Sequence, residues 1–356
     1  MKREKALLLL EDGTVFEGKS FGHIGQAVGE AVFYTGVVGY QEVLTDPSYR
    51  GTLVVCTYPI IGCYGVNDED SESPATHAWG IVVKEYSPYY SNFRAKGALE
   101  DFLIEHKIVG IQEVDTRAVT VHLRDHGEMK GLIASGEPDA DKLLDQLKSA
   151  ASPFEGDLVK DLPSPDVPEP SDGEKHRVVV LDLGVKNSLL AQLARLGCSV
   201  DAVPCTAAAD DVLAGKPQGV IVPGGPGDPN ALNGMIDTVR DLAAKVPVLG
   251  IGLGHQVLAL ALGCKIKRMK AGHHGVNHPV RDLAAKHCAI TVQHHSFVVD
   301  EGSIPDSVEV THQNVNDETV EGIRSKEHNA RSIQFHPTPD EMGNPSKILE
   351  DFLIHK

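Results

Sequence analysis

Residues 246–256 read Val-Pro-Val-Leu-Gly-Ile-Gly-Leu-Gly-His-Gln, and this stretch decides the fold of the second half of the chain. The apolar run up to Ile251 predicts a buried strand, the glycines predict a tight turn, and a helix follows from Gln256. In such an elbow, a side chain at the turn is held out of the sheet above the helix N-terminus, where nucleophiles are presented. Gly252 stands at that turn and has no side chain that could attack a substrate.

Strands and helices alternate around this elbow. We predict strands over 177–182, 199–203 and 219–222, with helices over 186–196 and 256–262. Strands so rich in Val and Ile indicate an α/β fold with a doubly wound, mainly parallel sheet that helices cover on both faces. Ligands of such sheets bind at the carboxyl ends of the strands, so the loops there are the candidate functional segments.

The first part of the chain has a different pattern of predicted strands and helices. Strand-like runs over 6–10, 12–16 and 30–34 are separated by glycines, and 99–106 and 116–125 have the spacing of amphipathic helices. This pattern predicts a β-rich mixed domain.

A segment rich in proline, residues 152–175, separates the β-rich part of the chain from the part in which strands and helices alternate. Its composition cannot bury a core, so we predict that it is a linker. A length of 356 residues suits two domains. We therefore assign 1–151 to the N-terminal domain, 152–175 to the linker and 176–356 to the C-terminal domain.

The net charge of −17 and the pI near 5.4 argue against binding to nucleic acids or anionic membranes. The apolar run from Ala6 to Leu10 is too short for a signal peptide, and no segment approaches a transmembrane span. The six cysteines are scattered without a Cys-x-x-Cys pair. These features predict a cytoplasmic protein with reduced thiols, whose partners are small molecules or other proteins.

The loop after the strand at 219–222 is glycine-rich and reads Pro-Gly-Gly-Pro-Gly-Asp-Pro over 223–229. Its backbone N–H groups could form an oxyanion hole, although a sharp turn explains the glycines equally well. The glycines of 250–254 do not form a dinucleotide fingerprint, because the third glycine is missing and the later segment 265–270 is basic.

Histidines give two further candidate sites. His336 follows a predicted strand and could act as a general base if a nucleophile faced it, whereas a lone histidine is more often structural. His273, His274 and His278 suggest a metal site, but no acidic residue or cysteine completes a ligand set at suitable spacing, so we expect no metal.

Motifs along the whole chain carry a resemblance to a known family. In the N-terminal half they are Tyr34–Tyr49, Thr57–Pro59 and Val114–Ala118, and in the C-terminal half Gly225–Pro229, Leu253–Gln256, Gly272–Gly275, Val310–His312, Thr319–Gly322 and Gln334–Pro337. The chain resembles the small subunit of carbamoyl phosphate synthetase, a class I (triad) glutamine amidotransferase, from end to end.

The resemblance implies a cysteine that attacks the carboxamide of glutamine, a histidine that takes its proton, and a glutamate that orients the histidine. These roles fall on Gly252, His336 and Thr338, so two of the three residue types are absent. Losing the nucleophile of a hydrolytic triad typically lowers turnover on the order of a million-fold. We therefore expect no glutaminase activity by the family's mechanism.

The resemblance also implies residues that hold glutamine. Ser48, Gly227 and Gln256 match substrate-holding positions, and the N–H groups of Gly225 and Leu253 match the oxyanion donors.

The family's Gln-Asn-His-Gly-Phe stretch is Gln-His-His-Ser-Phe at 293–297. An amide that grips the substrate is thus His294, a pocket glycine is Ser296, and Phe297 is kept. These changes predict a degenerate glutamine pocket. A substitute nucleophile, Cys264 or Ser296, is the alternative by which activity could survive.

By resemblance, the partner is a large subunit that binds ATP and Mg and makes carbamoyl phosphate for arginine or pyrimidine biosynthesis, while this chain binds no cofactor. We expect the chain to act as a scaffold in an assembly that uses free ammonia. Two alternatives stay open, namely a stand-alone binding or regulatory protein that uses the old glutamine pocket and a hydrolase with a substitute nucleophile.

Overall fold

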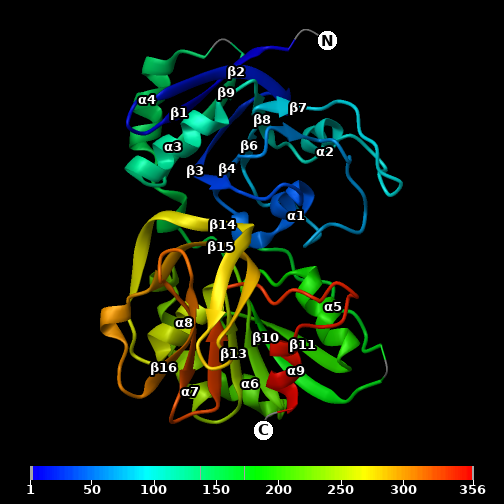
Figure 1. The fold of residues 1–356 in the computed structure, drawn as a ribbon, viewed down its shortest axis with the longest axis vertical. Helices are drawn as coiled ribbons and strands as arrows, with labels where there is room; N and C mark the ends of the chain where they lie inside the picture. Colours follow the sequence, from blue (N-terminus) through cyan, green and yellow to red (C-terminus); the bar gives the residue numbers. More distant parts are fainter. Residues whose placement is uncertain (1–2, 137, 172, 355–356) are drawn as a thin grey trace. The chain divides into compact units, whose positions relative to one another are not determined.

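The computed structural model describes residues 3–136, 138–171 and 173–354 (Figure 1). Met1, Lys2 and, within the predicted linker, Asp172 lie outside the described residues. The chain forms two compact units. Unit 1 comprises residues 1–158 and 270–274, and unit 2 comprises residues 159–269 and 275–356.

Unit 1 is built on a closed barrel with the strand order β1-β2-β8-β6-β4-β3-β9. The barrel closes because β1 pairs antiparallel with both neighbours, so that Leu8 lies opposite Phe16 on β2 and Ile133 on β9. Leu8 and Ile133 are fully buried in the barrel core. The barrel strands are β1 (Lys5–Leu10), β2 (Val15–Gly22), β3 (Gln26–Tyr34), β4 (Thr52–Cys56), β6 (Gly80–Val82), β8 (Val109–Gln112) and β9 (Met129–Ser135).

Helices pack on the outside of this barrel. The predicted helices are confirmed as α2 (Leu99–Glu105) and α3 (Thr116–His126). Helix α3 begins after Asp115, whose side chain accepts a hydrogen bond from the N–H of Ala118 at 3.0 Å. The remaining elements of unit 1 are α1 (Tyr40–Thr45), α4 (Ala140–Ser149), the 3-10 helices η1 (Pro47–Tyr49) and η2 (Pro153–Glu155), and the short strands β5 (Ile60–Ile61) and β7 (Glu85–Tyr86).

A five-residue part of strand β14 (Ile266–Asp282), residues 270–274, belongs to unit 1. There the side chain of Glu128 accepts a hydrogen bond from the N–H of Gly272 at 2.7 Å, and the same oxygen lies 2.7 Å from Nε2 of His274. Both side chains of the Glu128–His274 pair are fully buried. His274, a candidate metal ligand by sequence, thus holds a buried carboxylate.

Unit 2 contains a sheet with the strand order β11-β10-β12-β13-β18-β17-β16-β14-β15. The strands from β11 to β18 in this order run parallel, and those from β18 to β14 run antiparallel. The predicted strands and helices of this half are confirmed. The strands are β10 (His176–Asp182), β11 (Cys198–Pro204), β12 (Gly219–Val222), β13 (Val248–Ile251), β15 (His287–Val299), β16 (Val308–Asn314), β17 (Val320–Ser325) and β18 (Ala330–Ile333).

Helices cover both faces of this sheet, as the pattern predicts (Figure 1). Val220 and Val222 of β12 face α7 (Asn233–Ala243) and α8 (Leu253–Ala261) on one side. Ile221 between them faces α5 (Asn187–Arg195) and α9 (Lys347–Ile354) on the other. The other elements of unit 2 are α6 (Ala209–Ala214), η3 (Pro229–Ala231) and η4 (Glu301–Ser303).

The segment 152–175, predicted as a linker that cannot bury a core, contains a few apolar residues at its start that are buried. Phe154 in η2, Leu158 and Val159 are each buried. Leu158 would lie 3.2 Å from a Cβ on Gly51 of unit 1, and Val159 packs into the core of unit 2. The composition of the whole segment hides these few apolar residues, which are sufficient to anchor it.

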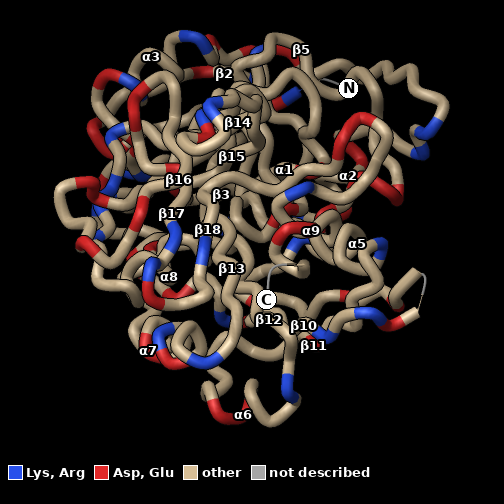
Figure 2. Tube along the Cα trace, turned by 60° about the horizontal axis from the view of Figure 1, so that its bottom comes forward, with Lys and Arg blue, Asp and Glu red and all other residues tan. Residues whose placement is uncertain are grey.

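Acidic and basic residues are interspersed along the chain (Figure 2). Many of their ion pairs are exposed, such as Arg324 with Glu309 and Lys347 with Asp351. Exposed pairs of this kind add little stability, because solvent screens them. None of the described helices is long and apolar enough to cross a membrane.

Candidate functional site

The elbow lies where β13 ends and α8 begins. Gly252, between them, has φ 57° and ψ −116°, a backbone conformation that L-residues rarely adopt. Its N–H donates to the carbonyl oxygen of Ile333 on β18 at 3.0 Å. The structure thus places Gly252 at the turn where the resemblance implies the nucleophile, in the strained geometry typical of such elbows.

Close backbone packing fixes the elbow. A Cβ on Gly254 would lie 1.9 Å from the carbonyl oxygen of Val222, and the N–H of Gly254 donates to the carbonyl oxygen of Pro223 at 3.0 Å. The first turn of α8 therefore lies directly against the end of β12. Only glycine allows this approach.

The glycine loop after β12 and the start of α8 bring two N–H donors to the elbow. Gly225 packs against Leu183, whose carbonyl oxygen would lie 2.3 Å from a Cβ on Gly225. Within the described residues, neither the N–H of Gly225 nor that of Leu253 donates to an acceptor. These are the two groups that the resemblance implies as oxyanion donors. Gly227, in the same loop, has φ 95°, which explains the glycine there.

His336 follows β18, and its N–H donates to the carbonyl oxygen of Val292 on β15 at 2.9 Å. The residue as a whole is partly exposed. Thr338, at the position of the orienting acid, is exposed, and among the described residues its side chain forms no hydrogen bond, with His336 or any other group. Thr338 therefore does not orient the imidazole of His336 as a carboxylate would.

Gln256, a substrate-holding residue by resemblance, is buried and engaged within unit 2. Its amide nitrogen donates to the carbonyl oxygen of Phe297 at 2.8 Å and to Oε1 of Gln334 at 3.0 Å. Both hydrogens of that amide are therefore used inside the protein.

The segment 293–297 lies on β15, and its side chains alternate between the two faces of the strand. On one face, Nε2 of His295 lies 2.7 Å from Oε1 of Gln293, and Nδ1 lies 3.0 Å from the carbonyl oxygen of Phe297. Ser296 is buried, whereas His294 is partly exposed. The two departures from the family's stretch thus share the face opposite His295.

A cavity of about 20 Å³ lies beside the elbow in unit 2. A volume of this size holds about one water molecule. Residues at the start of α5, Lys186 and Ser188, contribute to its wall, which sequence reasoning missed because a lysine before a helix has no distinctive pattern. The wall consists of Lys186, Ser188, Leu189, Pro223, Gly224, Ile251, His336 and Pro337.

His255, the neighbour of the elbow on α8, is completely buried. Its Nδ1 lies 2.8 Å from Oγ of Ser332 on β18. Burial lowers the pKa of His255 to about 3, and the nearby His312 contributes in the same direction. The ring is therefore neutral at neutral pH and ties α8 to β18.

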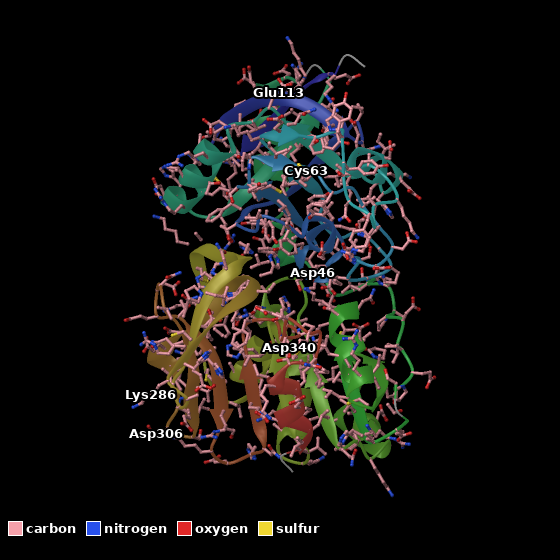
Figure 3. All side chains as sticks on the ribbon, turned by 45° about the vertical axis from the view of Figure 1, so that its right-hand side comes forward. Asp46, Cys63, Glu113, Lys286, Asp306 and Asp340 are labelled. Atoms are coloured by element: carbon pink, nitrogen blue, oxygen red, sulfur yellow. The ribbon has the colours of Figure 1, made fainter. Side chains whose placement is uncertain are left out.

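Ser48, the remaining substrate-holding candidate, belongs to unit 1. It is buried in η1, and its N–H donates to the Asp46 carboxylate at 2.9 Å. Figure 3 labels Asp46, which caps η1 in this way. Of the metal candidates, His273 and His274 belong to unit 1 and His278 to unit 2.

Cys264, considered above as a substitute nucleophile, follows α8. It is buried among Ala259, Val299, Val308 and Val320. Burial raises the pKa of its thiol to about 11. The reactive thiolate is therefore scarce at neutral pH.

Comparison with known proteins gives two family matches. The model for "Carbamoyl-phosphate synthase small chain, CPSase domain" matches residues 8–133, and the model for "Glutamine amidotransferase class-I" matches residues 179–356. The two matches fall in unit 1 and unit 2 respectively, apart from residues 270–274.

Curated relatives match nearly the whole chain. A carbamoyl phosphate synthase small chain of Syntrophotalea carbinolica is 43% identical over 347 residues, covering 94% of this chain and 92% of the relative. A protein of the same name from Oceanobacillus iheyensis is 44% identical over 356 residues, covering 100% and 96%. Among solved structures, a glutamine amidotransferase from Thermotoga maritima is similar over 45% of this chain and 75% of its own, with 18% identity and a TM-score of 0.37.

Proposed function

The chain belongs to the family of carbamoyl phosphate synthase small chains, and from this premise we propose that it is a small subunit that does not hydrolyse glutamine. It would bind a large subunit that uses ATP and Mg, and the assembly would make carbamoyl phosphate from free ammonia. The product would serve arginine or pyrimidine biosynthesis.

Gly252 is the observation that carries the loss of glutaminase activity. It stands at the turn of the elbow with φ 57°, where a reactive side chain would be presented above α8. Glycine offers no atom that could form a covalent bond to the carboxamide carbon. Without a nucleophile, only binding and the oxyanion donors remain, and these leave a small residual rate.

The base side of the site supports the same proposal. Thr338 is exposed and forms no hydrogen bond to His336 within the described chain, so position 338 supplies no carboxylate to orient the imidazole. The missing carboxylate at position 338 and the missing nucleophile at Gly252 thus both disfavour glutamine chemistry.

The parts that shape the fold are kept. Gly225 and Gly254 still allow the close backbone approaches of the elbow, and the barrel of unit 1 is complete. A chain that keeps the scaffold and loses the reacting groups suits a structural or channel-forming role. Of the two candidate substitute nucleophiles, Cys264 is unfavourable, because burial raises the pKa of its thiol to about 11.

The decisive experiment is carbamoyl phosphate synthesis by this chain co-purified with its large subunit. We expect activity with ammonium chloride and none above background with glutamine. The large subunit alone, assayed with ammonia, shows what the small chain contributes. Synthesis from glutamine would overturn the proposed loss, and failure of the two chains to associate would overturn the subunit role.

A further inference from the structure

Two histidines of unit 1 lie side by side on helix α3. His122 and His126 are four residues apart in this helix, and their ring centres lie 4.5 Å apart. Residues at this spacing share one face of a helix. Helix α3 lies on the outside of the barrel (Figure 1), where His126 is exposed and His122 is partly buried. Nothing in the proposed function uses this pair.

A carboxylate fixes the position of the hydrogen on the first ring. Nε2 of His122 lies 2.6 Å from Oδ2 of Asp12, which stands in the turn between β1 and β2. An ionised carboxylate only accepts hydrogen bonds, so Nε2 carries the hydrogen and Nδ1 of the neutral ring keeps its lone pair. Histidines that bind a metal through one nitrogen typically donate the other N–H to a carboxylate in this way.

Further contacts hold the Asp12–His122 pair in place. Oδ1 of Asp12 accepts a hydrogen bond from the N–H of Thr14 at 2.9 Å. The ring of Phe16 on β2 meets the His122 ring edge-on, with the ring centres 6.4 Å apart. The orientation of the His122 ring is therefore set before a ligand arrives, which lowers the entropy lost on binding.

The other ring nitrogens of the pair are available as donors. Among the described residues, neither Nδ1 of His122 nor either ring nitrogen of His126 forms a hydrogen bond. Neutral imidazole is the commonest metal ligand in proteins, and two histidines four residues apart on one helix face are a recurring zinc-binding pattern. The pair therefore offers two nitrogen donors to one ion.

The charged groups around the pair are close to balance. The guanidinium of Arg124 lies 2.9 Å from the Asp125 carboxylate. Lys270 and His126 also act on that carboxylate. With Asp12, two carboxylates thus face the cations Arg124 and Lys270, so charge alone neither attracts nor repels an ion strongly. The two imidazoles then decide which ion is preferred, and nitrogen donors suit zinc, copper and nickel, whereas magnesium and calcium prefer oxygen.

We propose that His122 and His126 bind a divalent transition-metal ion such as zinc, with water in its remaining coordination positions. Nδ1 of His122 and one ring nitrogen of His126 are the ligands, and Asp12 is a positioning residue that acts through His122. Because the unfolded chain lacks this arrangement, the bound ion stabilises unit 1. The site is separate from the elbow, which belongs to unit 2.

Isothermal titration of the full-length chain with zinc chloride tests this proposal. We expect saturable binding below the millimolar range. Magnesium chloride at the same concentrations should not compete, because magnesium prefers oxygen ligands. Competition by magnesium at equal concentration, or no zinc binding below the millimolar range, would overturn the proposal.

Matched variants locate the site, because the chain contains 17 histidines. His122→Asn and His126→Asn should each remove one equivalent of bound zinc. His328→Asn, which changes an exposed histidine of unit 2, should remove none. An unchanged zinc isotherm in His126→Asn would refute the role of the pair. If circular dichroism shows that His122→Asn does not fold, the exposed His126→Asn decides.

A third variant tests the role of Asp12. Asp12→Asn should weaken this zinc site about ten-fold, the usual effect of removing a carboxylate that orients a ligating histidine. A merely structural role of Asp12 in its turn would instead lower the urea midpoint measured without zinc and leave the zinc affinity unchanged. That result would refute the positioning role.

Discussion

The Cα atom of Gly224 lies 3.3 Å from the point that a Cβ atom would occupy on Gly252. This contact is tight, and a shift of a few tenths of an ångström would accommodate the side chain. The elbow therefore retains nearly enough room for the residue that the family's reaction requires. What the site lacks is the reacting group, more than the space for it.

Restoring the nucleophile and the acid should restore activity in two steps. Gly252→Cys alone should give a weak release of glutamate from glutamine, because Thr338 supplies no carboxylate to orient His336. Adding Thr338→Glu should raise turnover further, by up to the order of 10⁴-fold, the usual effect of the orienting acid in triads. Glutamate release by the purified complex measures both steps.

The control for this series is His336→Ala in the double variant, which should abolish the regained activity. A double variant no faster than Gly252→Cys alone would contradict the role assigned to position 338. The cysteine should also lower the free energy of unfolding by about 1–3 kcal/mol, because its φ would be positive.

The buried His255 should make stability fall in acid. Its pKa is about 3 in the folded chain and about 6.5 when unfolded, so the unfolded state binds the additional proton between these values. Stability is therefore complete above pH 6.5 and declines below it, by up to about 1.4 kcal/mol per pH unit. His255→Gln should flatten this slope, as measured by urea unfolding between pH 4.5 and 7.5. The exposed His328→Gln variant should keep the original slope.

Removal of the Glu128 carboxylate should destabilise unit 1. This carboxylate lies 2.7 Å from Nε2 of His274, and both side chains are fully buried. Glu128→Ala should lower the free energy of unfolding by about 3 kcal/mol, since it removes the carboxylate that contacts Nε2 of His274 and the N–H of Gly272. Glu128→Gln should cost less, because an amide oxygen still accepts a hydrogen bond. Asp125→Asn, in an exposed pair with Arg124, should have no measurable effect in the same denaturation assay.

Two glycines of unit 2 should respond oppositely to alanine. In Gly254→Ala, the new Cβ would meet the carbonyl oxygen of Val222 at 1.9 Å, so the elbow must distort and the variant should lose several kcal/mol or fail to fold. Gly234 lies in α7 with open space around it, and Gly234→Ala should stabilise the chain by about 0.5–1 kcal/mol. Thermal unfolding monitored by circular dichroism compares the two. A tolerated Gly254→Ala would contradict the close packing described for the elbow.

The sequence predicted the elements of unit 2 well, because each strand and helix there has a local signature. The run at 177–182 and the helix after the elbow could be recognised from their own residues. The closure of the barrel could not, since it depends on Leu8 pairing with Ile133 far along the chain. The anchoring role of Phe154 was missed for a related reason, because its burial depends on residues distant in the sequence.

In the candidate site, too, some residues could be identified from the sequence, whereas others could be identified only from the fold. Gly252 and His336 could be recognised from the strand–turn patterns around them, whereas Thr338 was assigned only through the resemblance to the family. Lys186 was not found, because it comes from another loop and only the folded sheet brings it near the elbow.

Strand β14 gives five of its residues to unit 1, and this arrangement restricts how the protein can be divided or recombined. A fragment that ends at Leu158 would contain Glu128 without Gly272 and His274, and would lose both of these contacts to that carboxylate. An exchange of N-terminal halves between relatives would have to carry residues 270–274 along. The N-terminal half of this chain therefore depends on residues that the C-terminal half encodes.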